Sequence, residues 1–188
     1  MQNTLIDVPI WVSNLDIDTK EIIDVAKDLF IKHPAKHELE IGDAQSSYGL
    51  TTEIGSYAEF DKLRELVIKN AKEYWGVYGL DARKEPEIHD SWMNRHGKGA
   101  FTFPHFHAQT PIAGVFYIQF KEGMGNLFMQ DPLHYHKAHE PRMNWESELE
   151  LPIQEKDLIL FPGWMQHWTG VNRLDEDRII MSFNIGYK

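Results

Sequence analysis

Residues 103–120 read FPHFHAQTPIAGVFYIQF, in which a His-x-His pair precedes an apolar, β-rich run. Successive side chains of an extended strand point to opposite faces, so His105 and His107 share one face. Two imidazoles on one face can bind one metal ion, and neutral imidazole suits Zn, Cu, Fe and Ni. The pair alone is weak evidence, because the chain has 10 His and a second such pair at His134 and His136. A metal site therefore needs a further ligand from elsewhere in the sequence.

Composition is that of an ordinary soluble protein, and the length of 188 residues predicts a single domain spanning 1–188. The absence of Cys excludes disulfides and thiolate metal sites. A formal net charge of −10 repels phosphate backbones and anionic membrane surfaces. No apolar run is long enough to cross a bilayer, and the N-terminus lacks a signal-peptide pattern. We therefore expect a cytoplasmic protein that binds neither nucleic acid nor membrane.

The first 84 residues are expected to pack a strand and helices against a core that occupies 85–188. The strand is predicted at 4–11. A first amphipathic helix follows a capping-box pattern at 18–21 and ends before Pro34. His33 and His37 flank this break and are interpreted as solvated surface residues.

A second amphipathic helix follows a short strand predicted at 47–54. The sequence SYAE at 56–59 has the capping-box pattern, and Gly76 or Gly79 is expected to end this helix. The two helices need an apolar surface to cover.

From about residue 85 the apolar period changes from that of helices to that of strands. The segment 132–150 has no clear period and is expected to be a long loop or lid. Short strands between Gly/Pro turns favour a mainly β sandwich or barrel with flanking N-terminal helices. The expected strands are 87–95, 112–120, 126–130, 158–161 and 178–187.

The last strand places different chemistry on its two faces. One face carries Arg178, Ser182 and Asn184, whereas the other is apolar throughout. An Arg that faces inward needs an anion, and its guanidinium matches a carboxylate in a bidentate geometry. The alternative is a salt bridge from Arg178 to Asp175 or Asp177, just before it in the chain.

Five motifs follow one another between residues 86 and 187. They are PHFH at 104–107, GVFY at 114–117, GNL with DP at 125–132, LILFPGWMQH at 158–167, and R with SFN at 178–184. In this order they resemble the Fe(II)/2-oxoglutarate-dependent oxygenases, and within them a small prolyl-hydroxylase-like family. No match covers the N-terminal 80 residues.

This resemblance implies a double-stranded β-helix, the jelly-roll or cupin-like fold. It implies that His105 and His167 are ligands of Fe(II). His107 occupies the position where most of the superfamily has Asp or Glu, since the usual triad is two His and one carboxylate. His107 is kept as the third ligand, and Asp131 is the carboxylate that could replace it.

The resemblance also implies 2-oxoglutarate as cosubstrate and O2 as oxidant. Arg178 and Tyr117 match the residues that bind the far carboxylate of 2-oxoglutarate. Asn94, Ser182 and Asn184 are further candidates for the cosubstrate pocket. The implied reaction hydroxylates a substrate while 2-oxoglutarate is decarboxylated to succinate.

Two other functions stay open at this stage. One is a three-His metal dioxygenase that needs no 2-oxoglutarate, and the other is a non-catalytic cupin-like module that binds a metal or a ligand. The sequence predicts a small-molecule or peptide substrate without identifying it.

Overall fold

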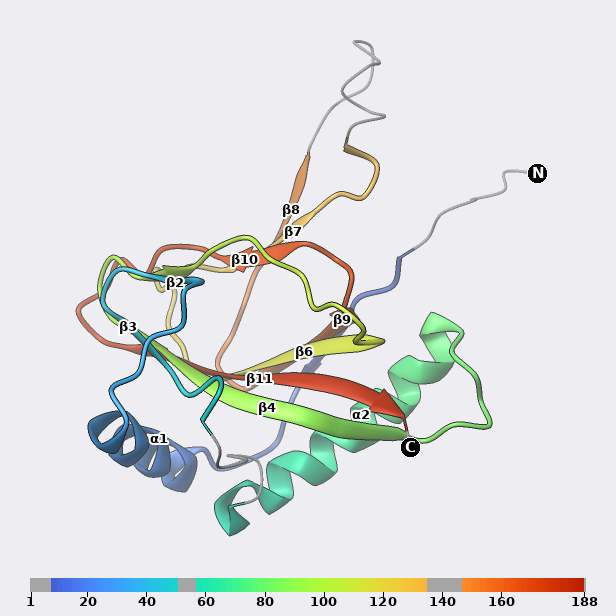
Figure 1. Cartoon of the computed structure of the whole chain (residues 1–188), viewed down its shortest axis with the longest axis horizontal. Helices are drawn as coiled ribbons and strands as arrows, with labels where there is room; N and C mark the ends of the chain where they lie inside the picture. The colour runs from blue at the N-terminus through green and yellow to red at the C-terminus, as the bar shows by residue number, and fades with distance from the viewer. Residues whose placement is uncertain (1–7, 51–56, 135–146, 188) are drawn as a thin grey trace.

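The computed structural model describes residues 8–50, 57–134 and 147–187. The chain forms a large antiparallel sheet with two helices on one face and shorter strands on the other (Figure 1). No helix in the described part of the chain is both long and apolar enough to cross a membrane.

The helices confirm the amphipathic pattern of the sequence. Helix α1 spans Lys20–Lys32 and buries Ile22, Ala26, Leu29 and Phe30. The predicted capping box is wrong in detail, because Thr19 is the N-cap and Asp18 accepts a 3.0 Å hydrogen bond from the Lys20 amide.

Helix α2 spans Asp61–Tyr78 and follows the 3₁₀ turn η2 at Ala58–Phe60. It ends at Gly79, one of the two predicted glycines, which has a left-handed φ of 79°. Gly76 instead continues the helix.

The strands form a jelly-roll of two facing layers. The large sheet has the order β1-β9-β6-β11-β4-β3, and the layer opposite contains β10-β7-β8 and β2-β5. The large-sheet strands are β1 (Trp11–Asn14), β3 (Ala44–Ser46), β4 (Pro86–His96), β6 (Ile112–Gln119), β9 (Asp157–Pro162) and β11 (Arg178–Tyr187). The opposite strands are β2 (Glu40–Ile41), β5 (Phe101–Thr102), β7 (Leu127–Gln130), β8 (Glu148–Leu151) and β10 (His167–Thr169).

Three predicted segments differ from the structure. The first strand begins at Trp11, and the N-terminal part of the prediction lies outside the described residues. Residues 47–50 form a turn, so the strand predicted there is wrong as far as the description reaches. The predicted loop 132–150 contains the start of β8, while 135–146 lie outside the described residues.

Two apolar cores lie on the two sides of the large sheet. One fills the space between the helices and the sheet and includes Met181 and Phe183 of β11. The other lies between the two layers and includes Tyr117 and Ile180. The two faces of β11 therefore belong to different interiors, as the alternation of its sequence predicts.

The His-x-His segment is held against the turn after β9 by backbone hydrogen bonds. The His105 and His167 backbones exchange bonds of 3.0 and 2.9 Å, and the His107 amide donates to the Gly163 carbonyl at 2.8 Å. A Cβ at Gly163 would lie 2.1 Å from the Thr110 carbonyl oxygen. Only glycine therefore allows the two segments to approach this closely.

Gly163→Ala should separate these segments and destabilise the fold by about 2 kcal/mol or more. Gly76→Ala is the matched control, because nothing lies within 4 Å of its added methyl group. The control should gain up to about 1 kcal/mol, since alanine is the better helix former. Urea unfolding of both variants measures the difference, and equal stabilities would contradict the proposed close contact.

Candidate active site

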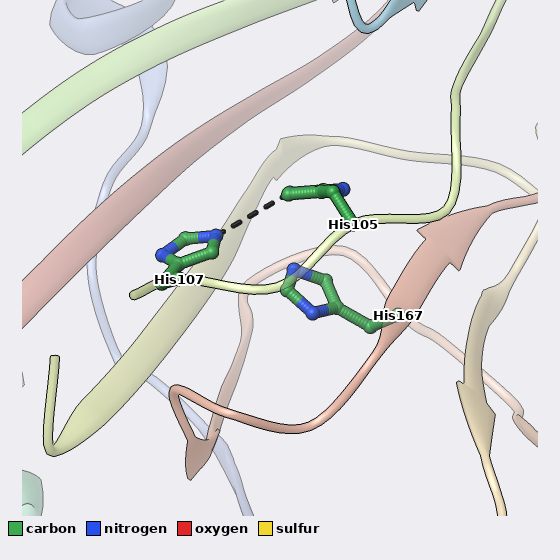
Figure 2. Close-up of side chains that lie close together, drawn as sticks. All are labelled: His105, His107 and His167. Atoms are coloured by element: carbon green, nitrogen blue, oxygen red, sulfur yellow. Dashed lines mark hydrogen bonds between the residues drawn. The ribbon is translucent and has the colours of Figure 1, made fainter. Parts of the chain in front are cut away.

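Three imidazoles from separate segments of the chain lie close together (Figure 2). His105 and His107 lie in the segment between β5 and β6, and His167 is the first residue of β10. One ligand nitrogen from each residue lies within 4.8 Å of the others. The sequence-predicted triad is therefore brought together, although 60 residues separate His107 from His167.

Hydrogen bonds fix the tautomer of each ring. The Nδ1 atoms of His105 and His167 lie 2.9 Å from the carbonyl oxygens of Phe103 and Met165. Nδ1 of His107 lies 2.6 Å from the side-chain oxygen of Asn184. Because these oxygens only accept, each Nδ1 carries the proton and each Nε2 keeps a free lone pair.

The lone pairs point at one another. Nε2 of His105 and Nε2 of His107 are 3.3 Å apart, a contact in which neither atom has a proton to donate. Two nitrogens bound to one ion at about 2.1 Å, with an angle near that of a tetrahedron or octahedron, are separated by roughly this distance. The geometry fits a shared cation.

Burial keeps these rings neutral. Desolvation lowers the pKa of His107 to about 4 and lowers the pKa of His105 as well. The pKa of His167 is well below its usual value, first because of burial and then because of the two neighbouring imidazoles. Neutral imidazole is the form that binds metals, so the cluster is ready for a cation at pH 7.

A cavity of about 280 Å³ opens beside the three imidazoles. Asn94, Ser182 and Asn184, the further candidates for the cosubstrate pocket, line it. His37 also lines it and packs its ring edge-on against Tyr48 at 4.8 Å, so its interpretation as a solvated residue is wrong. The remaining aromatic lining consists of Trp92, Phe106, Phe161 and Trp168.

Arg178 is fully buried and faces the space between the layers, as predicted. Its guanidinium donates to the carbonyl oxygens of Gly125 and Gly170 at 3.0 and 2.8 Å, to the Met124 carbonyl, and to Thr169 Oγ1 at 2.8 Å.

The alternative of a salt bridge from Arg178 to a neighbouring acid is wrong. Asp177 instead pairs with Arg95 at 2.7 Å, and Asp175 pairs with Lys98 at 2.8 Å. The carbonyl and hydroxyl partners of the guanidinium carry no charge, so none of them neutralises it.

Tyr117 is the second predicted anchor and is also fully buried. Its hydroxyl has no hydrogen-bond partner among the described residues. Burial raises the pKa of this phenol, and the nearby charge of Arg178 opposes the shift. An unpaired buried hydroxyl costs about 1–3 kcal/mol, so its presence beside Arg178 points to a ligand that accepts a hydrogen bond.

Asp131 does not join the imidazoles. Its carboxylate accepts a 2.7 Å hydrogen bond from the Leu133 amide, and the metal-binding group found in the described part of the chain contains only His.

Sequence reasoning missed one buried acid in the cavity wall. Glu40 of β2 is 3% exposed and its carboxylate lies 2.6 Å from Nε2 of His96. A two-residue strand has no readable period, so no sequence pattern marks Glu40 as buried. The only available signal is the alternation of β4, which gives His96 the same face as Asn94.

The fold and the His cluster define a class: proteins with a jelly-roll core and a site suited to a metal ion. A family described as "Putative 2OG-Fe(II) oxygenase" matches residues 90–184, half of the chain. The chain belongs to this family and is an oxidoreductase that uses Fe(II), 2-oxoglutarate and O2. No curated protein matches the sequence.

Solved structures share the fold at low sequence identity. HygX from Streptomyces hygroscopicus, with nickel and 2-oxoglutarate bound, superposes with a TM-score of 0.63 at 10% identity over 95% of this chain and 83% of its own. A prolyl-4-hydroxylase from Pseudomonas putida superposes with a TM-score of 0.62 at 11% identity, over 94% of this chain and 92% of its own. The viral collagen prolyl hydroxylase of Paramecium Bursaria Chlorella virus-1 superposes with a TM-score of 0.59 at 13% identity, over 94% of each chain.

The depressed His pKa values predict acid sensitivity of the metal-free protein. An unfolded His titrates near 6.5, whereas His107 titrates at about 4 in the fold. The unfolded state thus binds more protons in this interval, so stability is full above 6.5 and falls as the pH approaches 4. His107→Asn should reduce this fall, measured by urea unfolding with a chelator present.

His33→Asn, which removes an exposed imidazole at the end of α1, is the control. It should keep the wild-type dependence of stability on pH. If both variants weakened the dependence of stability on pH equally, the burial of His107 would not be the cause of that dependence.

Proposed function

We propose that this enzyme hydroxylates a C–H bond of a small-molecule or peptide substrate while it decarboxylates 2-oxoglutarate to succinate. In this proposal His105, His107 and His167 hold Fe(II). The observation that carries it is the convergence of three unprotonated Nε2 atoms at the wall of the cavity. Iron with 2-oxoglutarate and O2 supplies the oxidising chemistry when bound.

The far carboxylate of 2-oxoglutarate is assigned to Arg178 and Tyr117. The guanidinium supplies a positive charge that no acid pairs with directly, and the phenol supplies an unused donor. Neither side chain lines the present cavity, so the cavity must deepen between the two layers, along the inner face of β6 and β11, for the carboxylate to reach them. Asn94 and Ser182 are assigned to the walls of this pocket.

Substrate is assigned to the outer part of the cavity. Its wall carries the rings of Tyr48, Trp92 and Phe106, and the described residues that line it include no Lys or Arg. Such a wall suits an uncharged or aliphatic group placed next to the metal. Two proteins of similar fold illustrate the range of possible substrates. HygX binds the small molecule hygromycin B, and the prolyl-4-hydroxylase acts, by its name, on prolyl residues.

Tyr117→Phe tests the cosubstrate site. It removes a hydroxyl that has no hydrogen-bond partner in the described part of the chain, so stability should stay equal or rise. The affinity for 2-oxoglutarate should fall about tenfold or more, because a hydrogen bond to a carboxylate is lost. Calorimetric titration of 2-oxoglutarate into Mn(II)-loaded protein measures the affinity, and succinate release with Fe(II) measures turnover.

Tyr74→Phe is the matched control, since its hydroxyl donates to the Pro9 carbonyl at 2.7 Å behind the large sheet. It should lose about 1 kcal/mol of stability and keep the wild-type affinity. Unchanged affinity in Tyr117→Phe would remove Tyr117 from the site. If wild-type protein binds metal but no 2-oxoglutarate, the proposed reaction is wrong.

Asn184→Leu should weaken metal binding about 10- to 100-fold, because His107 loses the acceptor that orients its ring. Asn184→Asp keeps an oxygen in the same place and should keep most of the affinity. Competition with a fluorescent chelator for Zn(II) measures both. An equal loss of metal affinity in the two variants would show that the hydrogen-bond acceptor at position 184 does not determine metal binding.

A further inference from the structure

Glu40 belongs to a buried polar network that the proposed reaction does not use. Its carboxylate accepts a hydrogen bond from the Thr102 hydroxyl at 3.1 Å and lies 2.6 Å from His96. Both partners are buried, and Glu40 itself lines the cavity. A buried carboxylate in an enzyme pocket is costly unless its charge is balanced.

The balance runs through His96 to Arg178. Arg178 Nε lies 3.4 Å from Nδ1 of His96, and a guanidinium can only donate. The proton of His96 is therefore on Nε2, where it points at Glu40. Burial and the charge of Arg178 lower the pKa of His96, which keeps the ring neutral. One cation and one anion thus face each other across a neutral imidazole.

Few other charges reach this network. Arg95 of β4 is occupied by Asp43 and Asp177 at 2.6 and 2.7 Å. His105 feels the Glu40 charge but is neutral through burial. The buried region around Arg178 is therefore close to electrically neutral before any cosubstrate enters.

A carboxylate placed between Arg178 and Tyr117 would add a second negative charge to this enclosed region. Two carboxylates that share one cation in a buried site favour the uptake of a proton by one of them. Glu40 is suited to accept it, because it lines the cavity and its partners do not depend on a negative charge.

We propose that binding of 2-oxoglutarate is coupled to the uptake of one proton at Glu40. This inference rests on the proposed function, because it requires the far carboxylate to reach Arg178. Glu40 then acts as a positioning residue: ionised, it balances Arg178 in the free enzyme, and protonated, it yields that role to the cosubstrate. Affinity should consequently decrease as the pH rises.

Calorimetric titration of 2-oxoglutarate into Mn(II)-loaded protein tests this coupling. In buffers of different ionisation enthalpy, the observed enthalpy should vary with a slope of about one proton taken up. The dissociation constant should rise about tenfold per pH unit in the interval where uptake is complete. These measurements on the wild-type protein need no variant.

Glu40→Gln should abolish both effects, giving a slope near zero and a constant affinity. Glu38→Gln is the control, since it removes the same formal charge from an exposed site two residues away, and it should behave as wild type.

Three results would overturn the inference. Tight 2-oxoglutarate binding without proton uptake would leave the proposed function intact and remove the role of Glu40. Uptake that persists in Glu40→Gln would assign the proton to another group. No 2-oxoglutarate binding at any pH, in wild type or in Glu40→Gln, would overturn this inference and the proposed function together.

Discussion

The backbone pairing of His105 with His167 is the contact on which the site depends. Two hydrogen bonds join the segment before β6 to the first residue of β10. The same two residues carry imidazoles that face each other with ring centres 4.3 Å apart. A single long-range pairing therefore helps close the jelly-roll and sets the distance between two of the proposed ligands. A change that displaced this pairing would therefore also displace the site.

Burial acts in opposite ways on the three imidazoles and on Arg178. At the imidazoles it removes charge, because a desolvated His loses its proton. At Arg178 it cannot, because a guanidinium stays protonated even where burial lowers its pKa to about 10. The interior consequently holds one permanent cation, and its polar neighbours, including Glu40 and Tyr117, are arranged around that charge. This asymmetry suits a dianionic cosubstrate that reaches from a metal to a guanidinium.

Long periodic segments could be predicted from the sequence, and short paired ones could not. The alternation along β11 correctly assigned Arg178 to one interior and Phe183 to the other, because ten residues give five repeats of the period. Strands β2 and β3 have two and three residues, too few for any period, so the burial of Glu40 was missed. His37 was misassigned for a related reason: its partner Tyr48 is fixed by tertiary contact rather than by local pattern.

The third imidazole changes where negative charge must lie. With three neutral ligands a divalent iron keeps its full charge, whereas a facial triad with one carboxylate lowers it by one unit. The described structure places an acid one step further out. The Asn184 side chain, whose oxygen lies 2.6 Å from Nδ1 of His107, donates a hydrogen bond to the Asp90 carboxylate at 3.3 Å. An anion at this distance would favour a bound cation without being one of its ligands. A carboxylate that is absent from the ligand set can thus be offset in part by an acid that reaches a ligand through one hydrogen-bonded side chain.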